Sequence, residues 1–199
     1  MPDTGPPWNL RFPDVTDLVV DGPEQFENLA EDVAAGLSAA GGLVAVKSAI
    51  FTGTQTNSTA PGANFAVTNL TITHEVADPA NKLIISAFFG IVANSGGRGD
   101  VGLGIMENST FIGVGDAVGS RTRVGAGQVE GGDRSNFVTH SNALTFVHTP
   151  GAGEKTYTVR AINIRRGTET VYINRSQADT SDVNFPRGAS GFVIQEVKV

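Results

Sequence analysis

The sequence predicts a mainly β protein: an antiparallel, jelly-roll-like β-sandwich preceded by an extended N-terminal arm and one short α-helix. Charged residues make up only 17% of the 199 residues and 25 residues are glycine, which is typical of β-rich chains with many turns. From residue 43 onward, short β-branched and aromatic segments alternate with clusters of Gly, Asn, Pro and Asp. Because the sequence before residue 43 differs in character, we divide the chain into an attachment region, 1–42, and a sandwich domain, 43–199.

Residues 1–22 are expected to form the extended arm. Four prolines in this stretch favour extended backbone and remove hydrogen-bond donors. Trp8 and Phe12 are large apolar side chains in a segment too short to bury them itself. We therefore expect both side chains to dock on another protein surface.

Residues 23–37, PEQFENLAEDVAAGL, are expected to form the helix. Pro23 suits the first helical position, and the two glycines at 41–42 end the helical pattern. A narrow apolar seam with spacings of three, four and four is formed by Phe26, Leu29, Val33 and Leu37. Two interpretations remain open: the seam faces a twin helix in an oligomer, or it lies on its own domain.

Nine segments after residue 42 are expected to form strands. Each segment is short, rich in β-branched or aromatic residues, and bounded by turn residues. The segments are 43–53, 64–76, 81–93, 101–108, 109–116, 142–149, 155–165, 168–176 and 191–199. Eight or nine strands in one domain are typical of antiparallel sandwiches, and we expect a jelly roll.

The segment 82–92 is apolar on both faces, unlike a strand whose outer face meets water. One face is expected to carry Leu83, Ile85, Ala87, Phe89 and Ile91, and the other Ile84, Phe88 and Val92. Protein must therefore cover the second face. We favour a neighbouring subunit as the cover, and the arm and helix of the same chain are the alternative.

The glycine-rich stretch 111–127, FIGVGDAVGSRTRVGAG, resembles a nucleotide-binding loop only superficially. A phosphate-binding P-loop needs a Gly-Lys-Ser/Thr end and a following helix, and this stretch has neither feature. A dinucleotide site would need a βαβ unit, which the pattern does not predict. The alternation around Ile112 and Val114 instead predicts a hairpin region.

Arg121 and Arg123 are the candidate binding residues of this stretch. Because they are two residues apart, both side chains project from one face if the segment is extended. Our preferred interpretation is structural pairing with acids such as Asp116 or Glu130. The alternative is contact with an anion or a carbohydrate at a loop tip.

No metal, cofactor or catalytic site is predicted. The three histidines, His74, His140 and His148, lack metal-ligand spacing, and "SNAL" is expected to break any strand shared by the last two. Asp179 and Asp182 could hold calcium weakly, but a solvated turn is favoured. The chain has no cysteine and no G-x-S-x-G nucleophile elbow, and we predict a non-enzymatic protein.

Charge and hydropathy narrow the expected partners. The formal net charge of −6 argues against nucleic-acid binding, which needs a basic surface. No segment approaches the roughly 20 apolar residues of a membrane span, so membrane insertion is not expected. The beginning MPDTGPPWNLRFPD lacks the basic and apolar regions of a signal peptide.

Several segments together resemble a known family. They are LIISAFFGIV, FIGVGDAVGSRTRVGAG, LTFVHTPGAGEKTYTVRA, VYINRSQADTSDVNFPRGAS and the closing GFVIQEV. They look like a C-terminal β-sandwich domain of virion structural proteins in tailed, especially marine, bacteriophages, found in tail-fibre and head-decoration proteins. The N-terminal LRFPDVTDLVVDGPEQFENLAEDV likewise resembles the short attachment segments of such proteins.

The resemblance implies a non-enzymatic virion protein, a compact decoration, cement or short spike protein attached by its arm. The chain has no repeat or extended shaft between helix and sandwich, which favours a compact protein seated on the particle. The expected partners are other copies of the chain in a homotrimer, and capsid or tail proteins. The alternatives are a tail-fibre tip that binds a host-surface glycan, and a glycan-degrading enzyme.

Attachment and oligomerisation are expected to depend on apolar side chains in both regions of the chain. These residues are Trp8, Phe12, Phe26, Leu29, Val33, Ile84 and Phe88.

Overall fold

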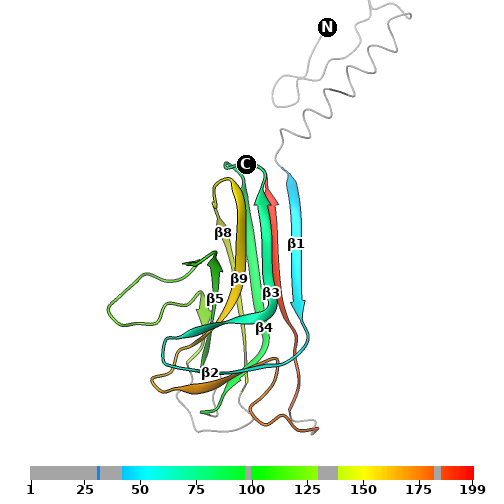
Figure 1. The fold of residues 1–199 in the computed structure, drawn as a ribbon. Coiled ribbons are helices and arrows are strands. Elements are labelled where there is room, and N and C mark those ends of the chain that lie inside the picture. The colour runs from blue at the N-terminus through cyan, green and yellow to red at the C-terminus, as the bar shows by residue number, and fades with distance from the viewer. Residues whose placement is uncertain (1–30, 32–41, 97–99, 130–138, 182–184) are drawn as a thin grey trace, which may run out of the picture.

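The computed structural model describes residues 31, 42–96, 100–129, 139–181 and 185–199 (Figure 1). Apart from the helical Glu31, every element in these residues is a strand. The strands are β1 (Leu43–Phe51), β2 (Gln55–Thr59), β3 (Asn64–Val76), β4 (Lys82–Asn94), β5 (Val101–Glu107), β6 (Thr110–Ile112), β7 (Ala126–Gly127), β8 (His140–His148), β9 (Gly153–Asn163), β10 (Glu169–Ile173) and β11 (Ser190–Val197). The expected arm, 1–22, lies outside the described residues, as does the expected helix, 23–37, except for Glu31.

The strands form two antiparallel sheets, which confirms the prediction of a mainly β, antiparallel protein. Sheet 1 has the order β1-β11-β4-β10-β2, and β8 pairs with the other edge of β4. Sheet 2 has the order β3-β9-β5-β6, and β7 also pairs with β5. In Figure 1 the C-terminus lies at the same end as the start of β1, where Lys198 N donates to Gly42 O at 2.9 Å.

The buried faces of the two sheets contribute to one hydrophobic core. Alternate residues of β4 and β11 in sheet 1, and of β3 and β9 in sheet 2, are buried in this cluster. The largest fully buried side chains are Tyr157, Phe89, Phe192, Leu70, Leu83, Ile85, Leu103, Ile105, Ile162, Ile173, Ile194 and Glu196. Leu83, Ile85, Ala87 and Phe89 therefore occupy the core face, as the alternation predicts.

The end of β4 departs from the predicted alternation. Val92 is fully buried in the core and Ile91 is only half-buried, so the predicted faces of these two residues are wrong. The cause is a bulge: the register of β4 against β8 shifts between Phe89 and Val92, which reverses the sides on which later side chains project. Gly90 fits this bulge because a Cβ there would lie 2.2 Å from Ala189 O.

Most of the predicted strands are present, with three differences. β2 and β7 were not predicted, and the segment 109–116 contributes only the three residues of β6. β8 runs from His140 to His148 without interruption, so the prediction that "SNAL" breaks this strand is wrong. Pairing with residues 83–92 of β4 holds these residues extended, and Asn142 Nδ2 donates a hydrogen bond to Val101 O at 2.7 Å.

Residues 111–127 form a loop between two short strands. β6 and β7 both pair with β5, at Ile105–Ile112 and Leu103–Ala126, so the expected hairpin within 111–127 is wrong. The hairpin turn instead joins β5 to β6 at Asn108, whose φ of 52° is left-handed. Gly125 N donates to Leu103 O at 2.9 Å and returns the loop to the sheet.

Candidate functional site

The most distinctive surface is the side of sheet 1 that faces away from the core. Four strands, in the order β1-β11-β4-β8, contribute three cross-strand rows to it. The rows are Ile50–Gly191–Phe88–Ala143, Ser48–Val193–Ser86–Thr145 and Val46–Gln195–Ile84–Val147. We call these twelve positions the outer face. None of them is a charged residue, and seven are Ala, Val, Ile or Phe.

Large apolar side chains on the outer face are open to solvent. Ile50 is 64% exposed, Val46 52%, Phe88 45% and Val147 65%. Single exposed apolar residues are ordinary, but contiguous apolar patches on soluble proteins commonly mark interaction sites. Because these residues adjoin one another in paired strands, the outer face is a candidate interface.

Where β3 pairs with β9, the corresponding side of sheet 2 has ordinary polar alternation. Thr71 and Thr158 face each other across β3 and β9 with their Oγ1 atoms 3.3 Å apart, and Thr73 and Thr156 do so at 3.2 Å. Arg160 on the same side donates from Nε to Asn64 Oδ1 at 2.8 Å. Hydroxyl and charged groups of this kind are well solvated, so this part of sheet 2 needs no further cover. Beside β5 on the same side, Ile162 and Phe111 pack over Gly104.

A groove of about 340 Å³ runs along one end of the outer face. It is lined by residues of β1, β4 and β11, among them Ile50, Phe88 and Gly191. The Phe88 ring lies over Gly191, since a Cβ there would lie 2.4 Å from Cε1 of Phe88. The groove is therefore an apolar recess flanked by two large side chains, with the dimensions to receive further apolar side chains.

The structure places only two of the predicted interface residues. Ile84 and Phe88 lie on the outer face, half-buried and exposed respectively. Trp8, Phe12, Phe26, Leu29 and Val33 lie outside the described residues. Sequence reasoning missed the contributions of β1, β8 and β11, although LVAVKSAIF in β1 shows the same lack of polar alternation as β4.

Arg121 and Arg123 lie in the loop between β6 and β7, where both are exposed. Arg123 donates from Nε to the backbone oxygen of Gly115 at 2.6 Å, so its described contact is with a carbonyl and not with Asp116. Glu130, the other acid considered as a partner, lies outside the described residues. These two arginines are thus not joined to a buried acid within residues 100–129.

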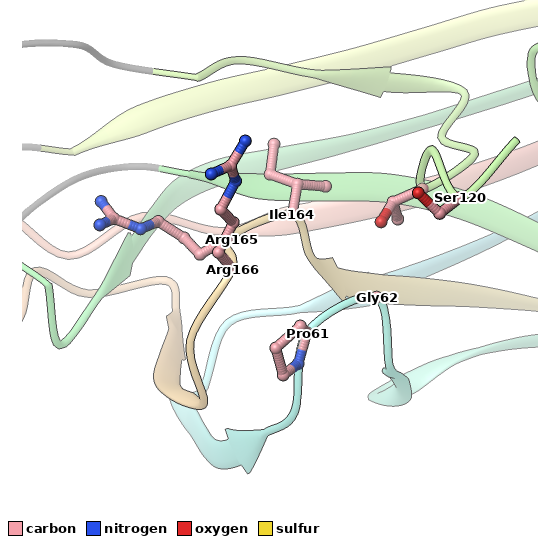
Figure 2. Close-up of a pocket in the computed structure, with 7 residues that line it drawn as sticks. Pro61, Gly62, Ser120, Ile164, Arg165 and Arg166 are labelled. Carbon is pink, nitrogen blue, oxygen red and sulfur yellow. The ribbon is translucent and has the colours of Figure 1, made fainter.

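A second recess lies where three loops meet (Figure 2). Its volume is about 380 Å³, and it is lined by Pro61, Gly62, Ser120, Thr122, Ile164, Arg165 and Arg166. Arg165 is held by the buried Asp100, with Nη1 2.9 Å from Oδ2, whereas Arg166 is exposed. The exposed guanidinium and two hydroxyls are groups that can bind an anionic ligand.

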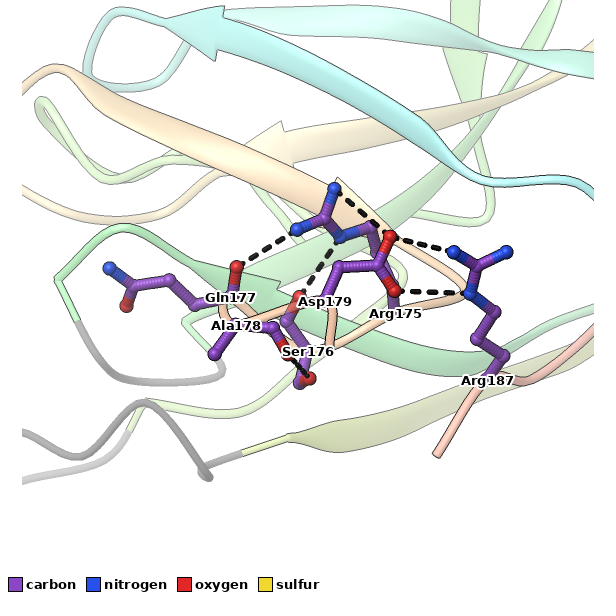
Figure 3. Close-up of polar contacts among 6 residues, drawn as sticks. All are labelled: Arg175, Ser176, Gln177, Ala178, Asp179 and Arg187. Carbon is purple, nitrogen blue, oxygen red and sulfur yellow. Dashed lines mark hydrogen bonds and ion pairs between the residues drawn. The ribbon is translucent and has the colours of Figure 1, made fainter. Parts of the chain in front are cut away.

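The INRSQAD segment after β10 forms a compact ionic cluster (Figure 3). Asp179 accepts two hydrogen bonds from Arg187, at 3.0 and 2.8 Å, and pairs with Arg175 at 3.5 Å. The guanidinium of Arg175 also lies 4.9 Å from the ring centroid of Tyr172. Two arginines already neutralise this carboxylate, so the predicted solvated turn is wrong at Asp179 and calcium would have to displace them. Asp182 lies outside the described residues.

A buried carboxylate joins the two sheets. Glu196 of β11 is 1% exposed and lies 2.8 Å from Nε2 of His74 in β3. Its other oxygen accepts from Ala77 N at 3.0 Å and Asn81 Nδ2 at 2.6 Å. Burial raises the pKa of Glu196, but the hydrogen bonds from Asn81, His74 and Ala77 outweigh burial and hold this pKa below its usual range.

A second carboxylate, Glu107, lies near the same region of the core. Its oxygens contact Tyr157 Oη at 3.2 Å and His148 Nε2 at 3.3 Å. Burial, followed by the neighbouring Glu107 carboxylate, raises the pKa of Tyr157 well above its usual range, so the hydroxyl remains a donor. Glu107 and Glu196 therefore satisfy buried donors, which is a structural role, and the described contacts assign them no substrate.

The described ranges contain no group of three or more His, Asp or Glu side chains placed to hold a metal ion. In the part of the chain that the structure describes, no helix has the length and apolar character needed to cross a membrane.

No protein-family model matches this chain, and no curated protein matches it.

Proposed function

We propose that the chain is a non-enzymatic structural protein of a bacteriophage virion, in which residues 43–199 form a jelly-roll-like sandwich and residues 1–42 attach it to the particle. The outer face of sheet 1 carries this proposal, because twelve adjoining positions without a charge form a surface suited to burial against protein, either a neighbouring subunit or residues 1–42 of the same chain. The resemblance of the sequence to virion structural proteins of tailed bacteriophages is the reason for placing the protein in a virion. The protein is then a compact decoration, cement or short spike protein.

The proposed partners are other copies of the chain and neighbouring capsid or tail proteins. A homotrimer is the expected assembly, and light scattering should then give three times the chain mass of 20.7 kDa. A monomer at micromolar concentration would contradict self-association without affecting attachment to the particle. The arm, with Trp8 and Phe12, is the proposed anchor.

Deletion of residues 1–22 tests attachment through the arm. The truncated protein should keep its β-sheet circular dichroism spectrum but be absent from purified particles, as measured by a specific antibody. The matched control is a full-length Trp8→Phe variant, which keeps an aromatic anchor and should still be incorporated. Full occupancy of particles by the truncated protein would show that the arm is not the anchor.

A receptor-binding module is the second candidate function, favoured by the recess of Figure 2. The exposed Arg166 and the hydroxyls of Ser120 and Thr122 could bind an anionic sugar on the host surface. Arg166→Ala should then lower adsorption of particles to host cells at least tenfold and leave particle assembly unchanged. Lys155→Ala, a half-buried cation at the start of β9, is the control, and equal adsorption by all particles would argue against this function.

A further inference from the structure

We infer that the outer face is covered by residues 23–37 of the same chain, lying as a helix along β11 with the seam of Phe26, Leu29, Val33 and Leu37 against the sheet. This inference concerns docking within one chain, and it goes beyond the proposed virion function without depending on it. It takes up the possibility that the helix covers its own domain.

The centre of the outer face has the shape and chemistry to receive such a seam. β11 lies between β1 and β4 and contributes Gly191, Val193 and Gln195 to the three rows. Larger apolar side chains flank it: Ile50 and Val46 from β1, Phe88 and Ile84 from β4. The centre of the outer face is therefore an uncharged surface: Ser48 and Ser86 lie beside Val193, and apolar side chains lie beside Gly191 and Gln195.

The length of the helical seam matches the length of β11 across the three rows. From Phe26 to Leu37 a helix rises about 16 Å at 1.5 Å per residue. From Gly191 to Gln195 a strand advances about 13 Å at 3.3–3.4 Å per residue. All three rows can therefore be covered by one helix of this length.

The connection to the sheet also permits this position. β1 begins at Leu43, at the end of the outer face that carries Val46. Only residues 38–42, SAAGG, separate the expected helix from this strand, and five extended residues span at most about 18 Å. A helix that ends at residue 37 can therefore reach the outer face of its own chain, and such a short connection gives it a high effective concentration there. Leu37 then lies nearest the Val46 row and Phe26 nearest the groove beside Gly191.

A second copy stacked on the outer face would have a small flat footprint on these twelve positions. Four strands about 4.8 Å apart and three rows about 7 Å apart cover roughly 400 Å² per copy, or 800 Å² in total. Stable protein interfaces bury about 1,200–2,000 Å² in total. A helix of the same chain avoids the entropic cost of bringing two molecules together.

Docking of this helix leaves other surface for contacts between copies. A helix is about 10–12 Å wide with its side chains, so one helix over β11 does not reach all of β8. β8 is an edge strand that pairs only with β4 in the described residues, and its Val147 remains exposed. Intrachain docking is therefore compatible with the proposed homotrimer.

Engineered disulfides test this inference directly, because the full-length chain has no cysteine of its own. Leu29→Cys and Val33→Cys are each combined with Val193→Cys, oxidised, and examined by non-reducing electrophoresis. We expect a fast-migrating, reducible monomer from at least one pair, formed by more than half of the molecules, because a disulfide needs Cβ atoms roughly 4 Å apart. Circular dichroism checks the fold, and Ser86→Cys in the same row replaces Val193→Cys if that variant unfolds.

The control pairs Leu29→Cys with Thr158→Cys on the polar side of sheet 2, and it should give less than one-tenth of the intrachain product. Disulfide-linked dimers and trimers from the Val193 pairs would overturn the inference in favour of a neighbouring copy's helix. Equal intrachain product in the control, or no cross-link from any pair in folded protein, would also overturn it. Neither result bears on incorporation into particles, so the proposed function is tested separately.

Discussion

The two sheets have equivalent buried faces but very different outer sides. On sheet 2, threonines pair across β3 and β9, and Arg160 bonds to Asn64, so this part of the side remote from the core is polar, whereas beside β5 it is covered by Ile162 and Phe111 of the same sheet. On sheet 1, twelve adjoining positions are uncharged, and Ile50 and Val147 are more than 60% exposed. Because both sheets share one core, stability of the core does not explain this difference. The difference is the reason for proposing that further protein covers sheet 1, whereas the β3–β9 part of sheet 2 faces solvent.

The largest expected effect concerns the buried contact that ties the two sheets together. Glu196→Ala removes the carboxylate and leaves the buried donor Asn81 Nδ2 and the part-buried donor Ala77 N without this acceptor. We expect a loss of about 3–5 kcal/mol in the free energy of unfolding, as for other broken buried pairs. Chemical denaturation measures this loss. A loss under about 1 kcal/mol would show that the pair contributes little to holding the sheets together.

The buried contacts of Glu196 also predict that the folded protein loses stability in acid. The pKa of Glu196 is lower in the folded protein than its usual value of 4.5. Its carboxylate therefore contributes stability fully above pH 4.5, and this contribution is lost as the pH falls through the lower folded value. Thermal unfolding between pH 7 and pH 3 should show a steeper acid decline for the natural chain than for Glu196→Gln. Parallel curves for the two proteins would contradict this assignment.

A new carboxylate should lower stability more on the outer face of sheet 1 than on the corresponding side of sheet 2. Ile84→Asp places a carboxylate in the covered region of sheet 1, and we expect it to cost about 1–3 kcal/mol in the full-length protein. Thr158→Asp places one on the solvated side of sheet 2, where surface substitutions usually change stability by within about 0.5 kcal/mol. Denaturant unfolding of both variants measures the difference. Equal small losses would mean that the outer face of sheet 1 is as open to water as that of sheet 2.

The smallest effect is expected in the loop between β6 and β7. Arg123→Ala removes an exposed hydrogen bond to Gly115 O and should lower stability by about 0.5–1 kcal/mol. Arg121→Ala is the matched control in the same loop and should change stability less. A combined loss above about 2 kcal/mol would reveal acidic partners that residues 100–129 do not provide. Melting temperatures of the single and double variants distinguish these results.

The sequence predicted where strands lie better than how they associate. β-branched and aromatic propensity located most strands, and β3 was bounded correctly at 64 and 76. β2, QTNST, was missed because its stability comes from pairing with β10 rather than from its own side chains. The bulge in β4 was missed because it depends on the close approach of Ala189 O to Gly90, a contact between residues distant in the chain.

The candidate surface was predicted only in part for a similar reason. The two apolar faces of 82–92 identified Ile84 and Phe88, which do lie on the outer face. Their neighbours on β1, β8 and β11 follow from strand pairing, which periodicity within one segment does not reveal. The recess near Arg166 likewise combines three loops, from residues 61–62, 120–122 and 164–166, which no local motif connects.

Thiol reactivity at matched positions on the two sheets tests the covered outer face most directly. Ser86 and Thr158 are both half-buried in the described residues, and each bonds to a hydroxyl on the neighbouring strand, at 3.0 and 3.3 Å. Ser86→Cys and Thr158→Cys, each the single cysteine of the full-length protein, are reacted with an uncharged maleimide under native conditions. Since protein covers only sheet 1 in this account, Ser86→Cys should react at least tenfold more slowly, and the two rates should become equal in denaturant. Equal rates in the native protein would show that the outer face is uncovered and would contradict the account.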